Sequence, residues 1–187
     1  IFRAARAAFP GVTLGGGMFS YFTELNRKRP PAELLDFVTH TTCPIVHAAD
    51  DIAVMETLEA LPYVIKSTKA FIAGRPYRVG PSGIPARDNP YGAAVAPNPD
   101  NRRVCLARMD PRQRGLFGAA WTLGYIAAFA RGGHPNTIVA STRGALAMAE
   151  PKRPHLPIGY WLRKADEALS RRVRQEEVPG RAADGAL

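Results

Sequence analysis

Short strand-like segments alternate with helical ones along this chain, and this alternation limits its fold more than any other feature. Apolar and β-branched segments bounded by Gly or Pro predict strands at residues 12–14, 36–41, 76–80 and 137–140. Apolar residues at helical spacing predict helices at residues 53–73, 110–131 and 158–173. Strands that alternate with helices form a parallel sheet with right-handed crossovers. The predicted fold class is therefore α/β.

About four βα units of this kind make up half of a (β/α)8 TIM-type barrel, and we expect the second half; an open sheet is the alternative. Local signals set the ends of the elements. The glycines at 15–17 are predicted to end the first strand, and Pro62 predicts a kink within helix 53–73. Asp110, followed by a proline, is the predicted N-cap of helix 110–131.

The chain has 187 residues, enough for one ordinary domain but fewer than the roughly 200–250 of a complete (β/α)8 barrel. It begins with Ile1 rather than Met, and residues 2–9 already read as the end of a helix. We therefore expect a piece of a longer chain. Residues 1–175 would form part of a barrel, and residues 176–187 a flexible tail.

Composition argues against several classes of partner. No apolar run reaches the roughly 18 residues of a membrane span, so we expect no membrane partner. The net charge of +9 comes mainly from Arg, but no nucleic-acid-binding module accompanies it, so we expect no nucleic acid. Cys43 and Cys105 have no partner at zinc-finger spacing, which favours a reducing compartment, the cytoplasm. The oligomeric state stays open, and no cofactor is predicted.

The links that follow the strands are long, whereas those that precede them are short. Residues 42–52 and 81–109 follow the second and third strands. Structureless loops of more than about 12–15 residues are uncommon unless they are functional. In barrels, the loops after the strands build the active site. We therefore expect the functional residues at the carboxyl ends of the strands.

The densest group of titratable residues follows the second strand: His40, His47, Asp50 and Asp51 lie within twelve positions. Histidine suits general acid–base work near neutral pH, and a carboxylate can hold its tautomer. The same groups can also bind a metal, but two histidines seven positions apart in a loop are not a typical metal spacing, so we expect no metal. One of the two aspartates is expected to cap the following helix.

Polar residues also follow the other strands. Glu24 and Asn26 adjoin an arginine, which indicates either a cluster that binds hydroxyl or carbonyl groups, or a loop salt bridge with a turn. Arg78 lies inside the third strand, and its fork of donors suits a carboxylate or an oxyanion. Asn89 and Tyr91 lie in the long loop beyond it, where they form either a binding element or only a turn.

Long runs of this sequence resemble one known family, the D-apionate lactonases. The runs are GGGMFSYFTELNR at 15–27, FVTHTTCPIVHAADD at 37–51, YRVGPS at 77–82, DNPYG at 88–92 and RMDPRQRGLF at 108–117. The resemblance implies a bacterial enzyme of D-apiose catabolism that hydrolyses D-apionolactone, a small sugar lactone, to D-apionate. It also implies a barrel like those of glycoside hydrolases.

Opening a lactone requires an activated water and donors for the carbonyl oxyanion. The residues predicted to be catalytic are His40 or His47 as the base, Asp51 to orient it, and Arg78. The residues predicted to bind substrate are Glu24, Asn26, Asn89 and Tyr91. Asn89 would assist Arg78 at the oxyanion or product carboxylate.

Two other functions stay open at this point, a glycosidase-like barrel and an inactive or carbohydrate-binding fragment. Retaining glycosidases use two carboxylates, one of them as nucleophile. In the related barrels that nucleophile ends the seventh strand, which is the strand at 76–80 if this is the second half. That strand ends without a carboxylate, so double-displacement glycoside hydrolysis is disfavoured.

Overall fold

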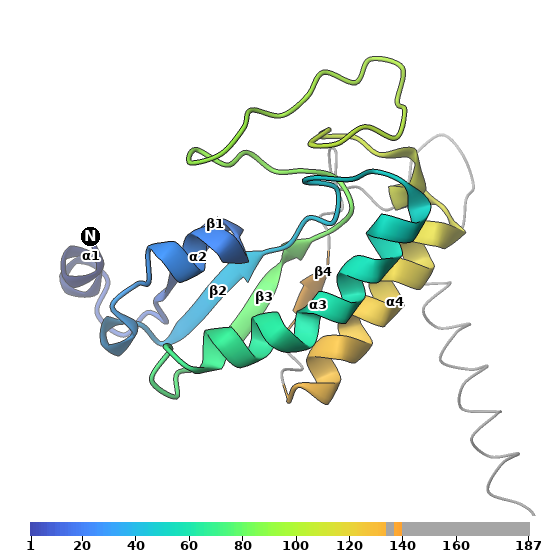
Figure 1. Ribbon diagram of the computed structural model, residues 1–187. Coiled ribbons are helices and arrows are strands. Elements are labelled where there is room, and N and C mark those ends of the chain that lie inside the picture. Colours follow the sequence, from blue (N-terminus) through green and yellow to red (C-terminus); the bar gives the residue numbers. More distant parts are fainter. Residues whose placement is uncertain (134–136, 140–187) are drawn as a thin grey trace, which may run out of the picture.

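A single parallel sheet organises the part of the chain that the structure describes. The computed structural model describes residues 1–133 and 137–139; the predicted helix 158–173 and the tail 176–187 lie outside the described residues. The strands are β1 (Gly15–Tyr21), β2 (Phe37–Thr41), β3 (Tyr77–Ser82) and β4 (Thr137–Val139). They pair in parallel in the order β1-β2-β3-β4 (Figure 1). The prediction of an α/β fold with a parallel sheet is confirmed.

Helices pack against one face of this sheet. The α-helices are α1 (Phe2–Ala8), α2 (Phe22–Arg27), α3 (Asp51–Lys69) and α4 (Leu116–Arg131), and the 3-10 helices are η1 (Ala32–Leu34) and η2 (Pro111–Arg114). The long helices α3 and α4 run side by side (Figure 1). Side chains alternate between the two faces of a strand, so Val38 and His40 of β2, both buried, face the helices. Phe37 and Thr39 point to the opposite face, which we call the uncovered face because the described helices do not pack on it.

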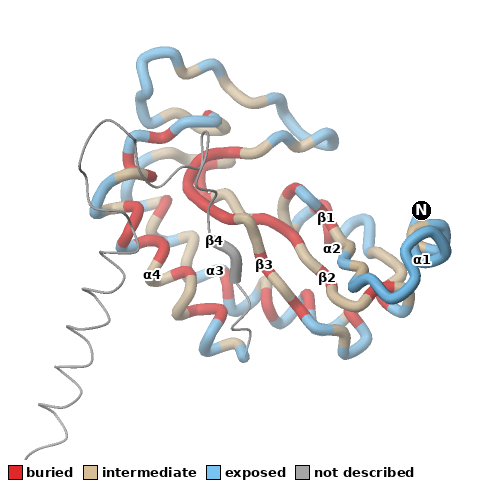
Figure 2. Tube along the Cα trace, turned by 180° about the vertical axis from the view of Figure 1, so that it is seen from behind, coloured by how far each residue is buried: buried red, intermediate tan, exposed pale blue. Residues whose placement is uncertain are grey.

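The core lies between the sheet and α4. Trp121, Tyr125 and Phe129 recur every fourth residue on α4, and all three are buried. Neighbouring rings along this row are 5.1 and 4.9 Å apart, and Phe129 meets the ring of Tyr77 on β3 edge-on at 6.0 Å. This four-residue spacing keeps the three rings on one side of the helix. Burial continues from β3 into the start of the loop that follows it (Figure 2).

The hydroxyl of Tyr125 links the helix layer to the carboxyl ends of two strands. It lies 2.6 Å from the Thr42 hydroxyl, just after β2, and 3.0 Å from the Ser82 hydroxyl at the end of β3. Each of these hydroxyls therefore has a hydrogen-bond partner, which for the buried Tyr125 and Ser82 removes the cost of leaving a buried polar group unpaired.

The first strand is not where the sequence predicted it. The predicted strand at 12–14 is wrong: residues 12–14 are irregular, and the glycines expected to end a strand begin β1 instead. The reason is steric. The ring of Phe37 occupies the place that a side chain on residue 15 would need, and the backbone of Thr39 does so for Gly17, whose φ is also +140°. A glycine run is therefore what lets β1 approach β2.

Other boundaries also differ. The loop expected after the first strand contains the short helix α2. The helix predicted at 110–131 is broken at Gly115, whose extended conformation (φ −114°, ψ −177°) separates η2 from α4. Asp110 is an N-cap as predicted, but of η2. Helix α3 spans Pro62 and begins two residues before its predicted start, because Asp50 accepts a hydrogen bond from the Ala53 amide.

Candidate functional site

A cavity lies at the carboxyl ends of β1, β2 and β3, where parallel strands deliver their loops to the same edge of the sheet. Its volume is about 290 Å³. Its walls come from the end of β1 with helix α2, the loop after β2, and the long loop at 83–110, which extends above these strand ends (Figure 1). The polar side chains that line it are Tyr21, Thr23, Glu24, Arg27, His47, Asn89 and Tyr91. We call it the site cavity.

Four of the eight residues predicted to act in the site line this cavity: Glu24, His47, Asn89 and Tyr91. They come from helix α2 after β1, the loop after β2 and the loop after β3, and are separated by as many as 67 positions in sequence, so the fold brings them together. His47 is exposed, and no hydrogen bond to its ring is found within residues 1–133. Both ring nitrogens are therefore open to a bound molecule or to water.

Glu24 brings a nearly buried carboxylate to the cavity. Its side chain is only 5% exposed, and its Oε1 accepts a hydrogen bond of 2.9 Å from Arg27 Nη1. Both residues belong to α2, three positions apart, so they lie on the same side of the helix. Arg27 bonds only one oxygen of the Glu24 carboxylate and is itself two-thirds exposed. Both charged groups therefore lie at the edge of the cavity.

Asn89 has a fixed amide orientation. Its Oδ1 accepts a hydrogen bond of 3.1 Å from the Tyr91 backbone amide, within a turn closed by the Gly92 amide on the Asn89 carbonyl. The oxygen is therefore occupied, and the Nδ2 group is the part left to donate to a ligand. Tyr91 is half exposed, and Lys28 Nζ lies 4.3 Å from the centre of its ring.

His40, predicted as an alternative base, lies outside the cavity on the helix-covered face of β2. It is 1% exposed. Its Nδ1 lies 2.8 Å from the Thr41 carbonyl oxygen and its Nε2 lies 2.6 Å from the Tyr77 hydroxyl. A carbonyl only accepts, so Nδ1 carries the proton and Nε2 accepts from the phenol. Burial lowers the pKa of His40 to about 4, against the opposing effect of the Thr41 carbonyl.

Asp51, predicted to orient the base, instead binds two arginines. Its Oδ1 accepts from Arg112 and its Oδ2 from Arg103, each at 2.8 Å. The hydrogen bond from Arg112 is the main reason that the pKa of this carboxyl is lowered. Arg112 also forms a two-point contact with the buried carboxylate of Asp110, at 2.9 and 2.7 Å. Asp51 therefore ties the start of α3 to the end of the long loop.

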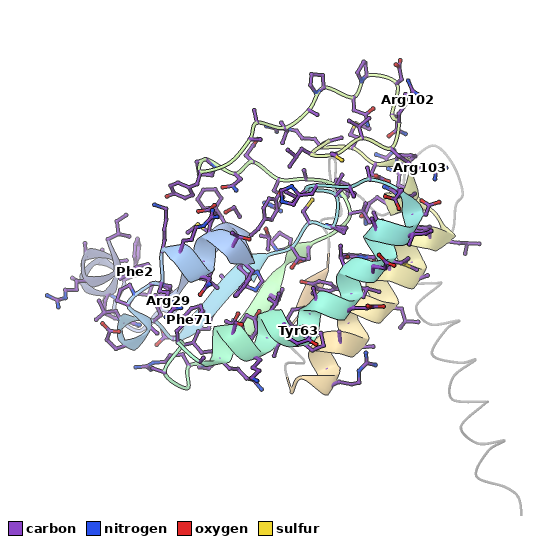
Figure 3. All side chains as sticks on the ribbon, in the orientation of Figure 1. Phe2, Arg29, Tyr63, Phe71, Arg102 and Arg103 are labelled. Atoms are coloured by element: carbon purple, nitrogen blue, oxygen red, sulfur yellow. The ribbon has the colours of Figure 1, made fainter. Side chains whose placement is uncertain are left out.

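Arg78 and Asn26 also lie away from the cavity. Arg78 is in register with Thr39 and so lies on the uncovered face, where its guanidinium stacks 4.1 Å from the ring of Phe37. Its Nε is buried without a hydrogen-bond partner among the described residues. Asn26 accepts a hydrogen bond from Arg29, whose guanidinium packs over Phe71 at the end of the sheet far from the long loop (Figure 3).

A second cavity, of about 380 Å³, lies at the opposite, amino ends of β2 and β3. Three of its charged side chains are already engaged: Arg6 donates to Asp36 at 3.0 Å, and Arg75 donates to the Glu33 backbone carbonyl at 3.1 Å. Within the described residues, no group of three or more His, Cys, Asp and Glu side chains is placed to hold a metal. None of the described helices has the length and apolarity needed to cross a membrane.

Comparison with known proteins agrees with the parallel α/β architecture. The sequence model of the family described as "D-apionate lactonase, TIM barrel domain" matches residues 1–169. The chain belongs to this family. The family predicted from the long sequence runs is thereby confirmed, and the sheet is that of a TIM barrel domain.

A curated member of the D-apionate lactonase family, the D-apionate lactonase of Brucella anthropi, is 50% identical over 148 residues. The match covers 79% of this chain and 24% of the relative, so the chain spans about a quarter of the relative's length. A solved β-glucuronidase of Ruminococcus gnavus aligns over 83% of this chain and 24% of its own, with 12% identity and a TM-score of 0.49. The same enzyme bound to D-glucaro 1,5-lactone aligns with 14% identity and a TM-score of 0.46.

Sequence reasoning gave no role to Tyr21 and treated Arg27 only as a neighbour of Glu24, yet both line the cavity. The sequence could have indicated that Arg27 lies beside Glu24 at the cavity. Residues three positions apart lie on the same side of a helix, so recognising α2 as a helix would have been enough. Tyr21 gave no such signal, since its hydroxyl contacts a residue 66 positions away.

Proposed function

We propose that this chain is part of a lactonase that hydrolyses a sugar-acid lactone, D-apionolactone, to D-apionate in bacterial D-apiose catabolism. One observation carries the proposal: the site cavity of a D-apionate lactonase family member gathers His47, Glu24 and Asn89 from the segments that follow three different strands. The cavity lies at the end of the sheet where TIM barrels carry their chemistry. A volume of about 290 Å³ suits a small sugar lactone.

In this proposal His47 is the general base. It takes a proton from a water molecule as the water oxygen attacks the lactone carbonyl carbon. The carbonyl π-electron pair moves onto the oxygen, and the Asn89 amide and the Arg27 guanidinium stabilise that oxyanion. When the oxyanion collapses, the ring C–O bond breaks, and the departing alkoxide takes the proton back from His47. The product is a hydroxy acid, which releases one proton to solvent.

Glu24 and Tyr91 bind the hydroxyl groups of the sugar in this proposal. Arg27 donates to Oε1 of Glu24, so the other carboxylate oxygen is available to accept a hydrogen bond from a sugar hydroxyl. His40, Asp51, Arg78 and Asn26 have no part in this reaction scheme, because each is engaged away from the cavity.

We further propose that the described strands and helices belong to the second half of a (β/α)8 barrel of about four βα units that spans residues 1–175, followed by a tail at 176–187. The uncovered face supports this arrangement. Phe37, Thr39 and Arg78 form a layer there that no described helix covers, and in closed barrels such layers fill the interior. The unbridged thiols of Cys43 and Cys105 support a reducing compartment, the cytoplasm, as its location.

Acid release from D-apionolactone in a pH-stat tests the function with the full-length enzyme. We expect saturable proton release well above the spontaneous rate. The matched variants are Asn89→Ala, inside the cavity, and Asn26→Ala, an asparagine on α2 that does not line the cavity. Loss of an oxyanion donor lowers kcat about 10²–10³-fold, so we expect that loss for Asn89→Ala and none for Asn26→Ala. No acid release from a well-folded parent would disprove the lactonase function.

A further inference from the structure

The hydroxyl of Tyr21 makes an unusual reciprocal contact across the site. It accepts a hydrogen bond of 3.0 Å from the Arg87 amide and donates one of 2.9 Å to the Arg87 carbonyl. Tyr21 ends β1, whereas Arg87 lies in the loop after β3. One side chain therefore satisfies both backbone groups of a residue on a different loop, which fixes the peptide units on either side of Arg87.

Arg87 marks the point where the long loop leaves the core. The five residues before it, 82–86, are all buried, and the Ala86 amide is held by the Ala107 carbonyl at 2.8 Å. Beyond it the described hydrogen bonds of residues 88–92 are the turn around Asn89 and an exposed ion pair between Asp88 and Arg108. Exposed ion pairs hold a loop only weakly. Tyr21 thus supplies the last partly buried anchor before Asn89.

We propose that Tyr21 is a positioning residue, whose hydroxyl fixes the Arg87 peptide and thereby the direction in which Asn89 donates into the site cavity. The role given to Asn89 rests on the proposed function; the anchoring of the loop does not. Only Asp88 lies between Arg87 and Asn89, so a rotation about the Arg87 backbone directly moves the Asn89 side-chain amide. Misplacement of a reacting group by about 1 Å can cost about 10²-fold in rate.

The anchor is also insensitive to pH. Burial, with a further contribution from the neighbouring Cys43 thiol, raises the pKa of Tyr21 well above the ordinary tyrosine value. The phenol therefore keeps the proton that it donates to the Arg87 carbonyl throughout the neutral and mildly alkaline range.

The test uses Tyr21→Phe in the full-length enzyme, which removes the hydroxyl and keeps the ring. The matched control is Tyr63→Phe, because Tyr63 is 74% exposed on the outer side of α3 (Figure 3). Hydrogen exchange measured by mass spectrometry reports on the amides of residues 86–92, and initial rates on D-apionolactone give kcat and KM. For Tyr21→Phe we expect at least tenfold faster exchange there and a fall in kcat of about 10–100-fold, with KM within about twofold. Tyr63→Phe should change neither.

A double-mutant cycle with Asn89→Ala separates positioning from general loss of structure. If Tyr21 acts through Asn89, the tyrosine substitution has little further effect on kcat once the amide is gone. Fully additive losses would overturn the proposal, and so would unchanged exchange at residues 86–92. If the parent shows no lactonase activity, the proposed function fails, but the exchange comparison still decides whether Tyr21 anchors the loop.

Discussion

The Nε2 atom of His40 accepts a hydrogen bond of 2.6 Å from the Tyr77 hydroxyl, between neighbouring strands and beneath the helix layer. The two rings also stack, with centroids 5.7 Å apart. This pair gives His40 a structural role, whereas His47, seven positions later, lines the site cavity with its ring nitrogens unbonded within the described residues. The two histidines of one sequence cluster therefore lie in opposite environments, and substitutions should separate their functions.

His40 should make stability depend on pH. Its folded-state pKa is about 4 and its unfolded-state pKa about 6.5, so below pH 6.5 the unfolded chain binds a proton that the folded chain does not. Stability is therefore complete above about pH 6.5 and falls as the pH drops towards 4, by about 3 kcal/mol in total. Protonation would also place a second donor against the Tyr77 hydroxyl. Urea unfolding at pH 4 to 8 measures this loss, and His40→Asn should reduce the slope; an unchanged slope would contradict the assignment.

His47→Ala should abolish most activity without weakening the fold. A positioned general base contributes about 10²–10⁴-fold to a rate, so we expect a fall in kcat of that size for D-apionolactone. Because His47 is exposed, the thermal unfolding midpoint of the His47→Ala variant should match that of the parent protein. His40→Ala should instead lower the thermal unfolding midpoint, with a loss of about 2–4 kcal/mol in the free energy of unfolding. Equal kcat in His47→Ala and the parent would exclude His47 as the base.

Arg112→Met should destabilise the protein far more than Arg103→Met. Both arginines bind Asp51, but only Arg112 neutralises the fully buried carboxylate of Asp110. Removal of one partner from a buried ion pair costs about 3–5 kcal/mol, because the remaining charge is left uncompensated. The Arg103 pair is exposed on both sides, so its loss should have no measurable effect on stability. Chemical unfolding of both variants makes the comparison, and similar losses would contradict it.

Gly17→Ala should disrupt the pairing of β1 with β2. A side chain there would meet the backbone of Thr39, and the φ of +140° is strained for any L-residue. We expect a loss of more than about 2 kcal/mol in the free energy of unfolding. Gly11→Ala is the control, because Gly11 also has a positive φ, of +80°, but has open space around it. If the two variants lose equal stability, the close approach of the strands is not the cause.

The sequence predicted the order and type of most elements because hydrophobic spacing is a local property. Strand 36–41 and helix 53–73 correspond to β2 and α3 within a few residues. The first strand was misplaced because glycines usually interrupt strands, and the need for a bare backbone at residue 17 arises only from Thr39, which lies 22 positions away. Tertiary contact here overrides local propensity.

The site was predicted in part for the same reason. Glu24, His47 and Asn89 were predicted because each follows a strand, and in a parallel sheet the segments that follow the strands lie at one edge. This reasoning did not distinguish His40 from His47, since a shift of one residue decides which face of the sheet a strand residue such as His40 points to. Nor did it show that Asp51 binds Arg112, a partner 61 positions away.

The buried hydroxyl of Tyr125 makes the geometry at the carboxyl ends of β2 and β3 depend on the length of α4. Thr42 and Ser82 stand where two strands give way to the loops of the site, and both meet that one phenol. Inserting or deleting a residue in α4 before position 125 would turn the phenol by about 100° around the helix axis and break both contacts together. If the chain has the proposed function, selection on catalysis would also act on α4, although no α4 residue lines the site cavity. We therefore expect α4 to tolerate substitutions on its outer side but not changes in length.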